Sequence, residues 1–264
     1  MRRFFLHLAY NGRSFCGWQV QPNAPSVQGV LEQALAVLFK TSVRLTGAGR
    51  TDTGVHAVSY YAHFDMDEPF WTAAVARSAK AAGTVLEDVY AHWVYQLNAL
   101  SGPDIAVYRL FETPLDCHAR FSAVERTYHY YFHVVKNPFI AESSYFVRQR
   151  LDMEAMRSAA ALLVGRKDFS AFEKLHGAEN SHICDLRRAE MRDLGNGRYC
   201  FVFSADRFLR NMVRAMVGTL LAVGQGRFAV SDVPVLLARR DRGKAGESVP
   251  GHALFLREVR YPDW

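Results

Sequence analysis

The sequence is poor in the features that mark disulfide-rich or metal-binding proteins. Only four cysteines occur in 264 residues: Cys16, Cys117, Cys184 and Cys200. They are far apart and form no Cys-x-x-Cys pair, which argues against a zinc ribbon or a redox motif and favours reduced thiols. No third ligand stands at a recognisable spacing from His129 and His133, so we expect no metal site.

Long apolar runs are also absent. No stretch approaches the roughly 20 residues that a membrane-spanning helix needs. The apolar start of the chain is interrupted by His7 and Tyr10 before a signal-like core can develop. We therefore expect a cytoplasmic protein with no membrane association. Hydrophobic residues make up 50% of the chain, which is enough for sizeable cores in one large or two smaller domains.

Acidic residues are outnumbered by basic ones, 26 to 32, which gives a formal net charge of +6. A positive excess suggests an anionic partner without identifying it. The arginines also fall in clusters, and each guanidinium can bind a phosphate through two hydrogen bonds. The clusters are Arg120/Arg126, Arg148/Arg150, Arg187/Arg188, Arg207/Arg210/Arg214 and Arg239/Arg240/Arg242. Their number, together with the net charge, makes nucleic acid the leading partner.

One glycine-rich segment, residues 47–57, combines Arg50 with Asp52. It fits neither the dinucleotide fingerprint, which needs a glycine at position 52, nor the P-loop, which needs Gly-Lys-Ser/Thr. The glycines permit close approach of a ligand to the main chain. Arg50 can favour the ionised form of Asp52, which would make this short carboxylate a nucleophile or a base. A tight turn in which Asp52 merely caps backbone N–H groups is the simpler alternative.

Asp52-Thr53-Gly54 also spells the triplet of aspartic proteases. That chemistry needs two carboxylates that share a proton, and therefore two copies of the triplet or a symmetric dimer. The chain contains one copy. A neighbouring Arg50 would favour ionisation, whereas a protease must keep one of its acids protonated. The protease interpretation is therefore the weakest alternative.

Hydrophobic periodicity predicts the order strand, helix, strand, strand, helix, strand in the first half of the chain. The strands are expected at residues 4–10, 42–48, 58–64 and 105–111, and the helices at residues 27–38 and 72–99. Ser26 is the expected cap of the first helix, and Gly83 is expected to break the second. The segment with Arg50 and Asp52 thus joins two strands.

The second half repeats this order. The strands are expected at residues 124–135, 186–193, 198–205 and 253–261, and the helices at residues 152–163 and 208–223. Gly195-Asn196-Gly197 predicts a hairpin turn. Two consecutive βαββαβ schemes predict an α+β protein of two ferredoxin-like domains, with sheets side by side and a central catalytic cleft. We assign residues 1–112 to an N-terminal domain with the Asp52 loop, and residues 113–264 to a C-terminal domain with Tyr128 and Arg214.

The expected helix at residues 208–223 follows or contains three arginines, Arg207, Arg210 and Arg214, spaced so that they line one edge. Arg214 stands among apolar residues, where an unpaired charge would be expensive, and Asp52 is a candidate partner. For Arg207 and Arg210, exposure that only aids solubility is an equal alternative. Tyr128 lies in an aromatic strand, where it could be core or a stacking platform for bases, and periodicity alone does not choose.

Residues 47–57 resemble the catalytic motif of the A-type (TruA) tRNA pseudouridine synthases. Other segments match that family in order along essentially the whole chain. They include Tyr10-Asn11-Gly12, Gly17-Trp18-Gln19, Cys117-His118-Ala119-Arg120-Phe121-Ser122-Ala123, Arg126-Thr127-Tyr128, Asp168-Phe169-Ser170-Ala171-Phe172 and Phe208-Leu209-Arg210-Asn211-Met212-Val213-Arg214. The resemblance implies isomerisation of uridine to pseudouridine at positions 38, 39 and 40 of the tRNA anticodon stem-loop, without a cofactor, by a homodimer.

The resemblance also implies roles for single residues. Asp52 matches the catalytic aspartate, and Arg50 the arginine linked to flipping the target nucleotide. Tyr128 matches the active-site tyrosine against the uracil, and Arg214 the arginine that pairs with the aspartate. Substrate binding is expected from Tyr128, Arg50, His118, Arg120, Arg126 and Arg210. The sequence departs from the family at Thr53, where alanine is usual, and at Arg207, where a small residue is common. A catalytically silent RNA-binding protein is the alternative from a different class.

Overall fold

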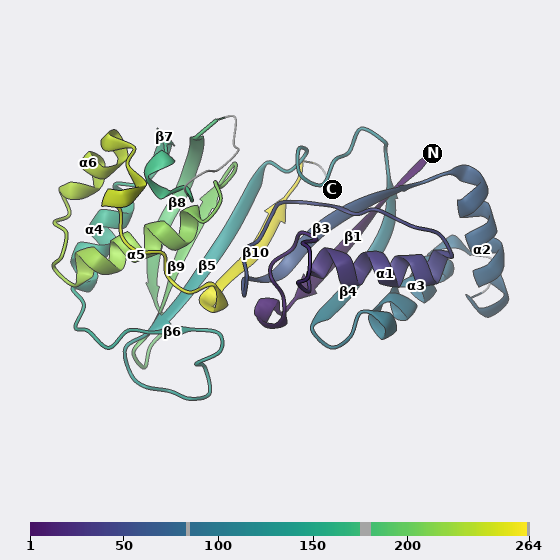
Figure 1. Ribbon diagram of the computed structural model, residues 1–264, viewed down its shortest axis with the longest axis horizontal. Coiled ribbons are helices and arrows are strands. Elements are labelled where there is room, and N and C mark those ends of the chain that lie inside the picture. The colour runs from purple at the N-terminus through teal and green to yellow at the C-terminus, as the bar shows by residue number, and fades with distance from the viewer. Residues whose placement is uncertain (83–84, 175–180, 263–264) are drawn as a thin grey trace. The chain divides into compact units, whose positions relative to one another are not determined.

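The computed structural model describes residues 1–82, 85–174 and 181–262 (Figure 1). Six α-helices and a set of mainly antiparallel strands occur in these residues, which confirms the predicted α+β class. The chain divides into two compact units, one of residues 1–123 with the chain from Tyr261 onward, the other of residues 124–260. In the described ranges, no helix is both long enough and apolar enough to cross a lipid bilayer.

Among the described residues, the first unit contains four strands and three helices. The strands are β1 (Arg2–Tyr10), β2 (Thr46–Gly47), β3 (His56–Met66) and β4 (Ile105–Thr113). The helices are α1 (Val27–Phe39), α2 (Glu68–Ala82) and α3 (Leu86–Leu100), preceded by a short 3₁₀ turn at Gly12–Ser14. The strands pair in the antiparallel order β4-β1-β3-β2. Helices α1 and α3 pack against each other, as Figure 1 shows.

Helix α1 illustrates why these residues fold as predicted. The Ser26 hydroxyl accepts a hydrogen bond from the Gly29 N–H at 3.2 Å and so caps the first turn. The helix ends at Lys40, whose backbone is left-handed. Its buried side includes Leu35 and Phe39, and the Phe39 ring meets the Trp93 ring edge-on at 5.0 Å. The Phe39 ring also lies 5.8 Å from the Phe64 ring of β3, so this face packs against the sheet.

Two boundaries in the first unit differ from the prediction. The strand expected at residues 42–48 is reduced to β2, because side chains of α1 take the main-chain groups of Leu45. The Leu45 N–H donates to the Glu32 carboxylate at 2.9 Å, and its carbonyl accepts from the Gln28 amide at 3.0 Å. The second helical region begins earlier, at Glu68, and forms two helices as predicted. The expected break at Gly83 lies outside the described residues.

The second unit contains six strands and three helices among the described residues. The strands are β5 (Glu125–His133), β6 (Tyr145–Phe146), β7 (Gly165–Asp168), β8 (Ile183–Asp193), β9 (Arg198–Ala205) and β10 (Leu254–Arg260). The helices are α4 (Met153–Ala161), α5 (Met212–Gly224) and α6 (Asp232–Arg239), with short 3₁₀ turns at Ser170–Phe172, Arg242–Lys244 and Gly251–Ala253. The strand order is β10-β5-β9-β8-β7, antiparallel throughout, and β6 pairs with β5 in parallel.

The predicted hairpin between β8 and β9 is confirmed. Gly195, Asn196 and Gly197 all have positive φ, at 77°, 53° and 70°, which a left-handed turn of this composition requires. Helix α5 begins at Met212, four residues later than predicted, because Asn211 has a φ of 68° and cannot continue a right-handed helix. The prediction did not include the short strands β6 and β7 or helix α6.

Helix α5 is buried along nearly its whole length against the unit's own chain. A Cβ on Gly218 would lie 1.7 Å from the Glu247 carbonyl oxygen, so only glycine allows this approach. The next residue, Thr219, accepts a hydrogen bond from the Gly246 N–H at 2.9 Å. The segment around residues 246–249 is therefore seated directly on α5.

Candidate functional site

Asp52 lies on the loop between β2 and β3, and the loop is held by a segment about forty residues earlier in the chain. The Thr51 carbonyl accepts a hydrogen bond from the Trp18 N–H at 3.3 Å. The Thr51 hydroxyl and the Tyr10 hydroxyl are 2.9 Å apart. Two residues after Asp52, the Gly54 N–H donates to the Phe15 carbonyl at 3.3 Å. Bonds on both sides of Asp52 thus fix the main chain that carries its carboxylate.

Glycines allow these segments to approach so closely. Gly17 has a φ of 92°, and a Cβ there would lie 2.2 Å from the Thr51 carbonyl oxygen. A Cβ on Gly12 would lie 2.0 Å from the Val55 carbonyl oxygen. Within the motif itself, a Cβ on Gly47 would lie 2.2 Å from the Tyr60 hydroxyl, and Gly54 has a φ of 77°. Gly47 and Gly54 are therefore required by the packing and the backbone conformation of the loop itself, and approach of a ligand to this main chain stays a prediction.

An aromatic wall backs the loop. The Trp18 and Tyr60 rings are 4.2 Å apart, and the Tyr10 ring meets Tyr60 edge-on at 5.5 Å. The Tyr60 hydroxyl exchanges hydrogen bonds with the main chain of Gly49. Asp52 is half-buried, and its carbonyl closes the turn by accepting from the Val55 N–H at 3.1 Å. The main chain that carries the carboxylate is thus held by hydrogen bonds, and the residue is partly exposed to solvent.

Arg50 is exposed, on the same loop. Its predicted interaction with Asp52 stays a prediction.

Tyr128 is half-buried on β5, between Phe203 of β9 and Leu256 of β10. Its ring meets the Phe208 ring edge-on at 5.1 Å. Tyr130 lies on the same face but is fully buried, and its hydroxyl donates to the Pro250 carbonyl at 3.1 Å. Burial also raises the pKa of Tyr130 far above its usual range. Among the tyrosines on this face of β5, Tyr128 is the more accessible one.

Arg214 lies in the first turn of α5 and is half-buried, whereas the other residues of this apolar helix are buried. Its partial exposure allows a charged side chain at this position. Its Nε donates to the Val249 carbonyl at 2.7 Å, and the Val249 N–H donates to the Arg214 carbonyl at 3.3 Å. The predicted need for a partner is thus met in part by the main chain. Arg207 and Arg210 precede α5, so the prediction that they line one helical edge with Arg214 is wrong. Arg210 is exposed, and its carbonyl accepts from the Lys174 N–H at 3.0 Å.

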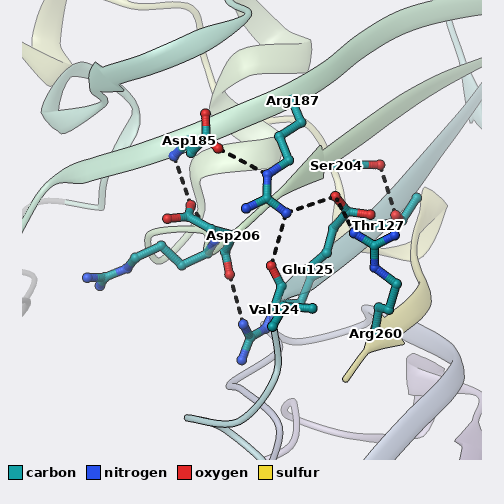
Figure 2. Close-up of polar contacts among 10 residues, drawn as sticks. Val124, Glu125, Thr127, Asp185, Arg187, Ser204, Asp206 and Arg260 are labelled. Carbon is teal, nitrogen blue, oxygen red and sulfur yellow. Dashed lines mark hydrogen bonds and ion pairs between the residues drawn. The ribbon is translucent and has the colours of Figure 1, made fainter. Parts of the chain in front are cut away.

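Asp206 connects the strand of Tyr128 with the segment before α5, and no prediction from the sequence included it. Its carboxylate Oδ1 accepts the Asp185 N–H at 2.8 Å and the Arg207 N–H at 2.7 Å, and its carbonyl accepts from Arg126 Nη1 at 2.8 Å (Figure 2). The signal that could have found it is an acidic residue placed directly between a strand and an arginine-rich segment. One residue thereby connects β5, β8 and the chain that leads into α5.

Arg187 reinforces this end of the sheet. Its Nε donates to the Asp185 carboxylate at 3.0 Å, and its Nη1 lies 3.1 Å from both the Glu125 carboxylate and the Val124 carbonyl (Figure 2). Arg260 approaches the same Glu125 oxygen at 3.5 Å. The expectation that the Arg187/Arg188 cluster binds phosphate stays a prediction. Its guanidinium groups already bind carboxylates, Arg188 through Glu190 at 2.6 Å.

His118 and Arg120 belong to residues 114–123, a loop of the first unit. The His118 Nδ1 accepts the N–H groups of Arg120 at 3.0 Å and Phe121 at 3.2 Å. Burial, assisted by the positive charges of Arg3 and Arg120, lowers the pKa of His118. Arg120 is exposed, with its guanidinium carbon 5.5 Å from the centre of the Phe121 ring.

The two units each carry part of the predicted site. The first holds Arg50, Asp52, His118 and Arg120, and the second holds Arg126, Tyr128, Arg210 and Arg214. In the second unit, Arg126 and Tyr128 of β5 contact Asp206 and Phe208 of the segment that leads into α5. The pairing of Asp52 with Arg214 stays a prediction. In the described ranges, no group of three histidine, cysteine, aspartate or glutamate side chains is arranged to hold a metal ion.

Comparison with known proteins identifies the family. The tRNA pseudouridine synthase A of Parabacteroides distasonis is 45% identical over 263 residues, covering 100% of this chain and 97% of that protein. The chain belongs to the tRNA pseudouridine synthase A family. The protein of that name from Porphyromonas gingivalis is 44% identical over 99% of this chain and 98% of its own length. A more distant member, from Burkholderia mallei, is 40% identical over 99% of this chain and 90% of its own length.

The sequence model of a family described as tRNA pseudouridine synthase also matches, over residues 159–262. These matches confirm the resemblance stated from the motifs, and they place the chain among the isomerases that modify RNA. The relatives match both units, so the Asp52 loop and the strand of Tyr128 lie within the shared length.

Proposed function

We propose that this protein isomerises uridine to pseudouridine at positions 38, 39 and 40 of the tRNA anticodon stem-loop, without a cofactor. The observation that carries the proposal is the half-buried Asp52, held on a loop whose main chain is bonded to residues 10–18. The formal charge of +6 favours a polyanionic substrate. We further propose that the protein works as a homodimer in the cytoplasm.

The reaction breaks the N1–C1′ bond of uridine, turns the uracil and joins C5 to C1′. The target nucleotide must first leave the base stack, at a cost of about a few kcal/mol. Arg50 on the RNA backbone and Tyr128 against the uracil ring offset that cost. The exposed position of Arg50 and the partial exposure of Tyr128 support these roles.

Asp52 assists bond cleavage in its ionised form. Two routes are open: addition of the carboxylate to C1′, from which attack by C5 later displaces it, or removal of a sugar proton, which Asp52 returns when C5 joins C1′. In either route the free uracil stays bound until C5 has joined C1′, and the C5 proton is then lost while N1 gains one. We assign removal of the C5 proton to Tyr128 and the electrostatic support of Asp52 to Arg214. Substrate binding is assigned to His118, Arg120, Arg126 and Arg210.

We also propose that residues 1–112 and 113–264 are two ferredoxin-like domains that share a catalytic cleft. The strand orders β4-β1-β3-β2 and β10-β5-β9-β8 support this proposal. In both, the fourth strand of the βαββαβ scheme pairs with the first, the first with the third, and the third with the second. The short strand β7 is then an addition to the second domain. The shared cleft itself remains a prediction of the sequence.

The test is Asp52→Asn, which keeps the shape of the side chain but removes its charge. Release of tritium from tRNA with 5-tritiated uridine should fall at least about 1000-fold, the scale on which an essential catalytic group acts. Binding of the same tRNA should stay within about threefold, because the carboxylate contributes to the reaction rather than to phosphate contacts. Asp67→Asn removes the same charge from an exposed position and should keep full activity.

The same measurement separates the rival functions. Tritium release by Asp52→Asn at the rate of the natural protein would exclude Asp52 as the catalytic group. A catalytically silent RNA-binding protein would bind tRNA without releasing tritium in any variant. A site-resolved map of pseudouridine in cells with and without the protein would then show no difference.

A further inference from the structure

The ring of Phe121 stands open to solvent on a loop that is otherwise tightly packed. It is 75% exposed, whereas the neighbouring Ala119 is fully buried. The ring is nevertheless in ordered surroundings, because the His118 ring lies against it with centres 4.4 Å apart and planes inclined by 35°. Arg120 contributes a guanidinium at 5.5 Å from the ring centre. An aromatic face, an imidazole and a cation are thus presented together.

Several bonds hold the loop that carries Phe121. His63 Nδ1 accepts the Ala119 N–H at 3.1 Å, and the Tyr261 hydroxyl donates to the Ala119 carbonyl at 2.6 Å. Arg3 Nη1 donates to the carbonyls of Leu115 at 2.6 Å and Cys117 at 2.8 Å. The loop therefore pays little ordering entropy when a ligand binds to the ring.

The imidazole behind Phe121 is neutral near physiological pH. His118 Nδ1 accepts the two N–H groups of residues 120 and 121, which places the ring proton on Nε2. Burial keeps the pKa of His118 below its usual range. Phe121 stays 75% exposed beside this uncharged imidazole, so its ring keeps surface for contact with a flat, weakly polar partner.

Another exposed phenylalanine provides the contrast. Phe139 is 95% exposed in the second unit, after Pro138. Among the described residues, no aromatic ring or guanidinium lies against it. Exposure alone therefore does not distinguish Phe121; the backing ring, the adjacent cation and the fixed main chain do.

We propose that Phe121 is a stacking platform for an unpaired base of the RNA substrate, with Arg120 bound to a neighbouring phosphate. The inference rests on the proposed function, since it takes the substrate to be an RNA with unpaired bases. A nucleobase fits better than an apolar protein side chain because the ring is flanked by a cation, which would attract the backbone of a nucleic acid. Every base has a π-face, so this contact would accept many sequences.

The experiment measures the affinity of the full-length protein for a fluorescent anticodon stem-loop RNA. Phe121→Ala should weaken binding by about 10-fold, within the range of one lost base stack. Phe121→Leu, which keeps the apolar bulk without a π-face, should weaken it nearly as much, whereas Phe121→Tyr should bind within about twofold. The salt dependence should stay unchanged in all three, because no phosphate contact is removed. Phe139→Ala is the matched control and should bind like the natural protein.

Three results would overturn the inference: unchanged affinity in Phe121→Ala, tight binding by Phe121→Leu, or an equal loss in Phe139→Ala. A change in oligomeric mass of Phe121→Ala with unchanged RNA affinity would assign the ring to a protein contact instead. Failure of the proposed function is a separate outcome, because the natural protein would then release no tritium from 5-tritiated tRNA. In that case the proposed role of Phe121 in binding the RNA substrate would be excluded as well.

Discussion

Two histidines of the first unit act as hydrogen-bond acceptors rather than as charges. His63 is buried on β3 and accepts the Ala119 N–H, while His118 accepts two N–H groups of its own loop. Their rings meet at 4.6 Å. A protonated Nδ1 could no longer accept these bonds. The conformation of residues 114–123 is therefore linked to the neutral state of both rings.

This linkage makes stability depend on pH. Burial, together with the nearby charge of Arg3, lowers the pKa of His63 from its usual 6.5 to about 4. The unfolded chain therefore binds this proton more tightly than the folded chain. The stabilisation is complete above about pH 6.5 and is lost as the pH falls towards about 4.

The variant His63→Asn tests this linkage, because its amide oxygen can still accept the Ala119 N–H but does not titrate. In urea unfolding between about pH 7 and pH 4.5, the free energy of unfolding should fall by about 2 kcal/mol less in the variant than in the natural protein. His129, whose pKa is also lowered to about 4, remains in both proteins and so cancels in the comparison. An identical pH dependence in the two proteins would contradict the role given to His63.

The binding partners of single residues could be predicted from the sequence to different degrees. The apolar neighbours of Arg214 predicted correctly that its charge needs a partner, and part of that partner is the Val249 main chain. Arg187 looked equally suited to phosphate, yet its guanidinium binds Glu125 and Asp185. The difference arises from long-range strand pairing, which brings these carboxylates to Arg187 and which no local pattern encodes.

At the scale of elements, the Asp52 loop depends on close contact between two segments. Gly47→Ala would place a methyl group 2.2 Å from the Tyr60 hydroxyl and 2.5 Å from the Trp18 Nε1. We expect a loss of about 1–3 kcal/mol in the free energy of unfolding, typical of overpacking, together with reduced activity as the loop shifts. Thermal unfolding and tritium release measure the two effects.

Gly49→Ala is the matched control two residues away. A Cβ on Gly49 would meet no atom within 4 Å, so the variant should unfold within about 0.5 kcal/mol of the natural protein. Equal stability of Gly47→Ala and Gly49→Ala would show that the contact of Gly47 with the aromatic wall does not matter.

The elements that the sequence predicted well are those with strong local signals. The capped start of α1 and the Gly195-Asn196-Gly197 turn were both predicted from a few residues, and both are confirmed. Residues 42–45 have the composition of a strand, but the side chains of Gln28 and Glu32 take the main-chain bonds of Leu45. Helix α5 was predicted too long because apolar periodicity cannot reveal the left-handed backbone of Asn211.

For the molecule as a whole, the charge balance predicts how tRNA binding responds to salt. Because binding releases counterions from the RNA, affinity should fall by about 100-fold or more between about 50 and 200 mM salt. Arg120→Gln should reduce the slope of log affinity against log salt by about one. Arg157→Gln, on an exposed helix residue 3.5 Å from Glu154, should leave the slope unchanged. A flat response of the natural protein would argue against tRNA as its partner.

The dense packing around Thr51 has a consequence for protein engineering. Gly12 and Gly17 are some forty positions from Asp52 in the sequence, yet any side chain added to either would collide with the main chain beside the carboxylate. A mutant library restricted to the Gly47–Ala57 motif would therefore leave Gly12 and Gly17, which also determine its shape, untouched. Transplanting this motif into another scaffold would require the whole stretch from the first strand through β3 as a single graft.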